Sequence, residues 1–272
     1  MPGFASYDQI INALTTGKGQ VFFLQKASAT SVAGFLYRLW NAAGNPPAGS
    51  EPSPALQGFA PTKDTVGAIP IKNPTSPATL HMLSFGAGGA TLGSLILYDR
   101  LWHVGGISLT STTTQTFTGV LAPTRHTDGV GNKLALEITT ATTGTSAVTI
   151  TVTYTNTLDQ TGRTATFTTP AATQPVNRVH IFNLQAGDVG VKSVQSIILS
   201  GSMSAGVANL IMFNDAEIVV VPWFANMFTE RDLVLQMANL PRVLDNACLA
   251  LMVQPSTTST GIIYGRLQLA EG

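Results

Sequence analysis

Residues 148–155 alternate without a break between apolar and threonine side chains. Because successive side chains of a strand point to opposite faces, this pattern predicts a strand with one buried and one polar face. A helix is disfavoured because β-branched residues lose side-chain freedom in it. The alternation resumes over residues 163–168, after the turn-rich segment 156–162. Two such runs joined by a short polar loop predict an antiparallel hairpin.

The polar face of this hairpin is almost uncharged. Residues 141–170 contain thirteen threonines and only two charged residues, Asp159 and Arg163. Charged residues make up 10% of the 272-residue chain and the net charge is zero, whereas ordinary soluble domains have about 25% charged residues. A surface of this kind does little to keep copies apart. We therefore expect neighbouring subunits to cover much of it.

The basic residues are dispersed singly, which disfavours a nucleic acid as partner. The longest apolar runs are too short for a membrane span, and residues 1–16 lack the features of a signal peptide. A single cysteine, Cys248, excludes an internal disulfide and fits assembly in a reducing cytoplasm. It lies in an apolar run, where we expect a buried thiol.

Between residues 94 and 222 short β-rich runs follow one another at regular intervals, separated by turn signals. This spacing predicts a mainly β protein built on an antiparallel β-sandwich of jelly-roll or Greek-key type. The flanking segments, 1–93 and 223–272, are expected to fold together as a smaller β-rich subdomain. Residues 35–44 fit either a strand or a short helix.

Two short helices and one irregular segment are expected in these flanks. Residues 6–16 have an amphipathic pattern with Ser6 as N-cap. Residues 229–240 have a second helical pattern, with Thr229 as N-cap and Pro241 as stop. Residues 44–58, rich in Pro, Gly, Ser and Ala, predict an extended loop or arm.

No catalytic, cofactor-binding or metal-binding motif is complete. The glycine-rich stretch 86–94 has serine where a phosphate loop needs lysine, so a flexible turn is expected. His126 and Asp128 come nearest to a metal or acid–base pair, but two groups complete no site. Asp215 and Glu217 are expected on one solvated strand face. The sequence therefore predicts no enzyme and no cofactor.

The three tryptophans, Trp40, Trp102 and Trp223, each lie in an apolar run. Exposed aromatic side chains on a β-sandwich can stack on sugars. Burial in the core or at a subunit interface is the more common situation for such a residue, and we expect it here.

Three blocks of sequence, in their order, carry a family resemblance. SLILYDRLWHVGGISLT is followed by LAPTRHTDGVGNKLALEITTATTGTSAVTITVTYTNTLDQTGRTATF and then by TERDLVLQMANLPRVLDNACLALM. Together they resemble structural proteins of tailed-bacteriophage virions over roughly residues 95–255. The resemblance implies a capsid-associated decoration or cement protein on the virion surface, made in the host bacterial cytoplasm. It carries over no catalytic residue.

The expected partners are the major capsid protein and copies of the chain itself, as a trimer or another symmetric oligomer. An alternative is a tail, neck or fibre component that contacts a receptor or glycan, which predicts an exposed aromatic cluster. A third, a carbohydrate-active enzyme, requires two carboxylates facing one cleft. Mixed polar and aromatic content beside core strands marks the expected subunit contacts: Asp99, Arg100, Trp102, Arg125, His126, Asp128, Glu230, Arg231 and Arg242.

Overall fold

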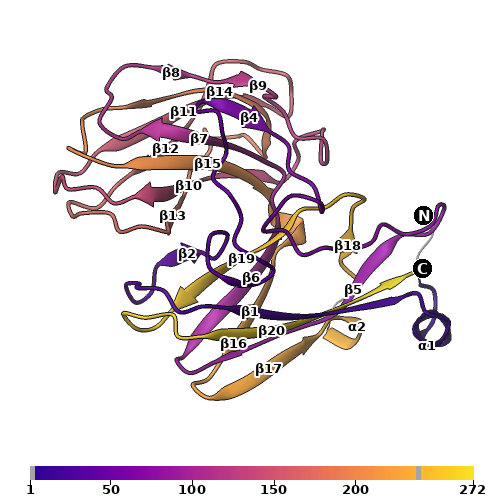
Figure 1. Ribbon diagram of the computed structural model, residues 1–272. Coiled ribbons are helices and arrows are strands. Elements are labelled where there is room, and N and C mark those ends of the chain that lie inside the picture. Colours follow the sequence, from indigo (N-terminus) through magenta and orange to yellow (C-terminus); the bar gives the residue numbers. More distant parts are fainter. Residues whose placement is uncertain (1–3, 237–239) are drawn as a thin grey trace.

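A computed structural model describes residues 4–236 and 240–272. The chain is mainly β, as predicted, and its sheets are antiparallel apart from one short parallel contact between β4 and β9. Figure 1 shows two packed bodies, and one long sheet runs through both of them. Each body is a sandwich formed by one half of this long sheet and a second sheet.

The long sheet has the strand order β16–β6–β19–β2–β13–β10–β15–β7–β4–β9. Its strands are β16 (Val219–Trp223), β6 (Gly93–Asp99), β19 (Leu249–Pro255), β2 (Leu36–Arg38), β13 (Arg178–Ile181), β10 (Asn132–Thr140), β15 (Val207–Asn214), β7 (Trp102–Ser108), β4 (Gln57–Phe59) and β9 (Thr118–Gly119).

The first sandwich pairs the β7 half of the long sheet with a four-stranded sheet. That sheet contains β12 (Arg163–Thr168), β11 (Thr149–Asn156), β14 (Val191–Leu199) and β8 (Gln115–Thr116). The order β7–β15–β10–β13 on one side faces β8–β14–β11–β12 on the other. The chain thus alternates between four strands of the long sheet and the four-stranded sheet, in the strand order of a jelly roll.

The predicted threonine hairpin is part of this jelly roll. Thr149 pairs with Thr168 and Tyr154 with Arg163, in continuous register along β11 and β12. The apolar positions of β11, which include Ile150 and Val152, are fully buried in the core between the sheets.

The second sandwich, here called the end sandwich, is built largely from the two ends of the chain. Its outer sheet contains β17 (Met227–Asp232), β5 (Leu80–Gly89), β20 (Ile263–Glu271), β1 (Gly19–Lys26), β3 (Gly44–Asn45) and β18 (Arg242–Val243). It packs on β16, β6, β19 and β2 of the long sheet. The subdomain boundaries at residues 94 and 222 stay a prediction; β6 and β16, which lie there, pair with each other and pack into this second core.

A third cluster lies on the opposite face of the long sheet. It combines Tyr98 of β6 and Ala250 of β19 with Ile211 and Phe213 of β15. The two halves of the long sheet thus pack against each other through the face that neither sandwich core uses. Trp40 belongs to this cluster, and Trp40, Trp102 and Trp223 are each at most 1% exposed, so their expected burial is confirmed.

The first predicted helix is confirmed. α1 (Tyr7–Thr15) begins after Ser6, whose side chain accepts a hydrogen bond from the Gln9 amide. The second prediction was wrong at its start, because Thr229 lies inside β17, which pairs with β5. Helix α2 (Leu233–Gln236) begins only after Asp232, which caps the amides of residues 234 and 235. Residues 237–239 of the predicted helix lie outside the described residues.

Two further expectations need correction. The glycine-rich stretch does not form a flexible turn from residue 86, because Gly86 and Gly88 lie inside β5 and pair with strands on both sides. Asp215 and Glu217 do not lie on a strand, because they form the short 3-10 helix η1 (Asp215–Glu217) that follows β15. The open choice for residues 35–44 is decided in favour of a strand, β2.

Candidate functional site

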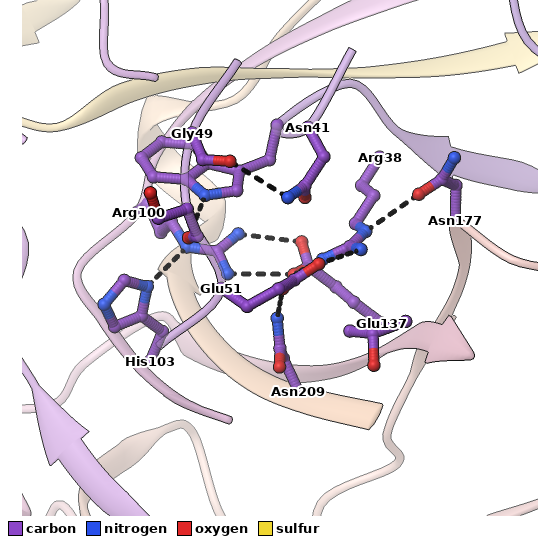
Figure 2. A network of polar contacts seen from close by, with 12 residues as sticks. Arg38, Asn41, Gly49, Glu51, Arg100, His103, Glu137, Asn177 and Asn209 are labelled. Carbon is purple, nitrogen blue, oxygen red and sulfur yellow. Dashed lines mark hydrogen bonds and ion pairs between the residues drawn. The ribbon is translucent and has the colours of Figure 1, made fainter. Parts of the chain in front are cut away.

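Two arginine–glutamate pairs form a network where the two sandwiches meet (Figure 2); Arg38, Arg100 and Glu137 are buried in it, and the Glu51 side chain is 41% exposed. Arg38 ends β2, Arg100 follows β6, and Glu137 lies within β10. Arg100 donates from Nη1 and Nη2 to the two carboxylate oxygens of Glu137, both at 2.8 Å. Arg38 donates to the two oxygens of Glu51 at 2.9 and 2.6 Å, and its Nη1 lies 3.5 Å from Oε2 of Glu137. The network therefore balances two positive and two negative charges.

Glu137 and Arg100 remain ionised although both side chains are fully buried. Burial alone would raise the pKa of Glu137, but the guanidinium groups of Arg100 and Arg38 hold it below its ordinary value. Burial and the neighbouring Arg100 lower the pKa of His103 to about 3, so this ring is neutral near pH 7. Its Nδ1 accepts a hydrogen bond from Nε of Arg100 at 3.0 Å. Glu137 and His103 are thus each held in one charge state.

The network fixes the position of the proline-rich loop, residues 44–58. Glu51 lies on this loop and also accepts a hydrogen bond from Asn209 of β15. The indole Nε1 of Trp40 donates to the carbonyl of Ser50 at 2.9 Å. A Cβ on Gly49 would lie 2.3 Å from this indole, so only glycine permits the close approach. Of the loop or arm expected at 44–58, residues 46–56 form neither helix nor strand, and the hydrogen bonds of Glu51 and of the Ser50 carbonyl fix this loop to the molecule.

Lys26 fastens the beginning of the same loop. Its ammonium group donates to the carbonyls of Ala42 and Pro46 at 3.0 and 2.8 Å. Burial lowers the pKa of Lys26 to about 8. The lysine thus fixes the chain on both sides of β3.

Beside the network lies a hollow of about 360 Å3, lined by Glu51, His103, Ser50 and Ser53 among others. Within the described part of the chain, no three His, Cys, Asp or Glu side chains come together as metal ligands. None of the described helices is long and apolar enough to cross a membrane. The arrangement of the network can position the loop and join the sandwiches, and its groups are paired with one another.

A second buried cluster lies close to the first along the chain. Arg125 donates to both oxygens of Asp99 at 2.7 and 2.8 Å, and the amide of Cys248 donates to Oδ1 of Asp99 at 2.7 Å. The Cys248 thiol is buried, as expected. This cluster ties the turn before β10 to β6 and β19.

His126 takes a different partner from the one considered in the sequence. Its Nε2 lies 2.9 Å from Oε1 of Glu217, off the direction of a well-aligned hydrogen bond. Contact with Glu217 raises the pKa of His126, while burial raises the pKa of Glu217. Asp128 instead accepts a hydrogen bond from the amide of Val130 at 3.2 Å, as an ordinary turn residue. His126 and Asp128 thus have separate partners in the structure.

The expected subunit contacts fall into two groups. Asp99, Arg100 and Trp102 have no exposed surface and Arg125 is 6% exposed. Their polar groups are used within the chain, including Nε1 of Trp102, which donates to the carbonyl of residue 120 at 2.7 Å. Asp99, Arg100 and Trp102 have no surface with which to reach another subunit, and the guanidinium group of Arg125 is used by Asp99, so these four side chains hold the fold itself. For the others a contact role stays a prediction: His126, Asp128, Glu230, Arg231 and Arg242.

The outer face of the four-stranded sheet presents hydroxyl groups in rows, and these positions define the hydroxyl face. One row contains Thr164, Thr153, Ser196 and Thr116; the next contains Thr166, Thr151 and Ile198; the last contains Thr168 and Thr149. Thr149 and Thr168 are joined by a side-chain hydrogen bond of 2.9 Å. No charged side chain stands at these nine positions, which confirms the uncharged face expected from the threonine alternation.

The outer face of the end sandwich is different, because it exposes large apolar side chains. Phe23 of β1 is 70% exposed, Phe228 of β17 is 50% exposed and Tyr264 of β20 is 49% exposed. We call these three residues the aromatic face. No motif in the sequence distinguishes these residues; the signal available was the alternation in β1 and β20, which gives no indication of which face is covered.

Comparisons with known proteins found only weak similarity to solved structures. No protein-family model matches the chain, and no curated protein has a similar sequence. Among solved structures, one of infectious bursal disease virus, Gt strain, matches with 8% identity and a TM-score of 0.17. The match covers 93% of this chain and 81% of the viral chain. The VP2 subviral particle of the same virus covers 93% and 80%, with 9% identity and a TM-score of 0.17. Similarity at this level carries no argument about function.

Proposed function

We propose that this chain is a non-enzymatic structural protein of a bacteriophage virion. In this proposal it decorates the head, binds the major capsid protein and copies of itself, and stabilises the shell. The observation that carries the proposal is the hydroxyl face. Rows of threonine and serine lose less on desolvation than charged side chains do, so such a face suits burial against another subunit.

Two further observations support a role in an assembly. The three sequence blocks resemble virion structural proteins of tailed phages. The jelly-roll order of the first sandwich is one that viral capsid domains use, although fold alone assigns no function. Many weak subunit contacts across a shell add up through multivalency.

A second candidate function is a tail, neck or fibre component that contacts a receptor or glycan. This candidate predicted an exposed aromatic cluster, and the aromatic face of the end sandwich is such a cluster. Head decoration remains the first proposal because it makes use of the uncharged hydroxyl face.

A cryo-electron microscopy map of the intact particle, in which this chain is located, tests the proposal directly. Density spread over the capsid lattice and bridging neighbouring subunits is the expected result. Density confined to the tail or neck would replace the first candidate with the second. Absence of the chain from the particle would overturn both.

A variant pair tests the role of the hydroxyl face. We expect Thr166→Lys to reduce incorporation into particles, because it places a charge in the proposed interface. Thr161→Lys, at the exposed turn of the same hairpin, serves as the control and should be incorporated normally. Equal incorporation of both variants would show that the hydroxyl face is not the contact.

A further inference from the structure

Neighbouring strands of the end sandwich place aromatic and amide side chains in one row. Gly88 of β5 lies directly opposite Phe228 on one side and Tyr264 on the other. Tyr264 in turn faces Gln25 of β1, which faces Asn45 of β3. The next row along the strands runs from Glu230 through Gly86 and Arg266 to Phe23. Both rows belong to the outer face, since the residues that alternate with them on β20 are buried.

The ring of Phe228 lies against the backbone of β5. A Cβ on Gly86 would lie 2.6 Å from Cε1 and Cζ of this ring, and a Cβ on Gly88 would lie 3.1 Å from its Cδ2. The two glycines therefore form a floor on which the ring rests. Because half of the Phe228 side chain is still exposed, the ring offers an open surface whose position is already fixed.

The charges on this face are already compensated. Nη1 of Arg266 lies 2.8 Å from Oε1 of Glu230, and Nη2 of Arg266 donates to Gln268 at 3.2 Å. An anionic or cationic ligand would have to break this pair before it could find a partner. The amide of Gln25 is neutral and offers a donor and an acceptor at the other end of the first row, and the amide of Asn45, whose Nδ2 donates to the carbonyl of Phe23, adds an acceptor oxygen. The face is thus complementary to a ligand that is polar and uncharged.

The surface is hollowed rather than flat. A hollow of about 540 Å3 is lined by Phe23, Gln25, Asn45, Phe228 and Tyr264 among others, and a second of about 510 Å3 lies on the Gly88 and Ile262 side of the same two rings. Small-ligand sites have volumes of roughly 300 to 1,000 Å3. A second protein copy needs close packing over a broad area at the centre of an interface. Two adjacent hollows separated by rings fit a chain of small rigid units better.

We propose that this face binds a neutral oligosaccharide. Phe228 and Tyr264 would stack on the apolar faces of sugar rings, while the amides of Gln25 and Asn45 would bind hydroxyl groups. The inference deepens the second candidate function by naming the surface and the class of ligand. It does not depend on where the chain sits on the particle.

The test starts with the full-length protein on a microarray of neutral and anionic glycans. The neutral oligosaccharide bound best is then titrated calorimetrically against the protein and its variants. We expect Tyr264→Ala and Phe228→Ala to weaken binding at least about tenfold, since each removes one of the two proposed stacking surfaces. Phe224→Ala is the matched control, because Phe224 is an exposed aromatic residue that lines neither hollow. It should bind as the unaltered protein does.

A further variant changes the floor without removing an aromatic ring. Gly86→Ala should push the Phe228 ring away from β5 and weaken sugar binding, while circular dichroism confirms that the fold is retained. Retention of no neutral glycan on the array, or of anionic glycans alone, would overturn the proposal. Self-association in sedimentation that Tyr264→Ala abolishes would also overturn it, because the face would then belong to a second copy. None of these outcomes changes where the particle map places the chain, so this proposal and the virion role fail separately.

Discussion

Arg100 and Glu137 form an ion pair of two parallel hydrogen bonds, both 2.8 Å long, and neither side chain has exposed surface. One residue follows a strand of the end sandwich and the other lies within the jelly roll. The pair therefore joins the two halves of the long sheet at the point where they fold toward each other. Removal of either partner would leave an uncompensated charge in a dry environment, which is far more costly than the loss of a surface pair.

Glu137→Gln is expected to lower the free energy of unfolding by about 3 to 5 kcal/mol, because it leaves the Arg100 charge without its counterion. Urea denaturation followed by circular dichroism measures the change. Glu230→Gln is the control, since its partner Arg266 is one-third exposed and a surface pair contributes about 0 to 1 kcal/mol. Equal losses in the two variants would contradict the importance of burial at Glu137.

Gly49→Ala should destabilise the protein by about 1 to 3 kcal/mol, because the new methyl group would overlap the indole of Trp40. The loop that carries Glu51 would have to lift away from the network. Limited proteolysis should then cut within residues 44–58 of the variant first. In Gly201→Ala the nearest atom is Cγ2 of Val148 at 3.8 Å, an ordinary contact, so this control should remain as stable and as resistant as the unaltered chain.

The sequence predicted well those elements whose secondary structure is determined by residues close to one another in the chain. The threonine hairpin and α1 depend on side-chain alternation, turn residues and one capping serine, all within a few positions of one another. Thr229 and Asp232 show where local evidence stops, because both can cap a helix. The helix begins after Asp232 and not after Thr229, because residues 227–232 pair with β5 as a strand. That pairing partner lies far away in the sequence.

The buried network and the aromatic face could not be derived in the same way. Glu137 lies on the face of β10 opposite to Leu134 and Leu136, which is where a solvated side chain is expected. That face is covered because the other half of the long sheet packs on it, and the covering partners come from residues 38, 51 and 100. Likewise, Phe23 and Tyr264 belong to strands at opposite ends of the chain, so their common exposed face depends on tertiary structure.

Stability should rise with pH between about 4 and 6.5, in part because of His180. Burial lowers the pKa of this ring to about 4 in the folded chain, where it stacks on Phe167 with ring centres 4.4 Å apart. The unfolded chain binds the proton below about pH 6.5. Protonation in this window therefore favours unfolding, by up to about 1.4 kcal/mol per pH unit. Urea denaturation at several pH values should show a smaller slope for His180→Gln, and parallel curves for the two proteins would contradict the assignment.

Cys248 should be unreactive in the folded protein. Burial raises the pKa of its thiol to about 12, and the side chain has no exposed surface, so thiolate is scarce and shielded near pH 8. We expect an aromatic disulfide reagent to label the native chain only as fast as the chain opens, and to label it at once in urea. Thr161→Cys in a Cys248→Ala background places a thiol at an exposed turn and gives the reference rate for an accessible group. Labelling of native Cys248 at that reference rate would mean that the contact between β6 and β19 opens readily. The hydrogen bonds of Asp99 to Arg125 and to the Cys248 amide would then not hold the two sandwiches together.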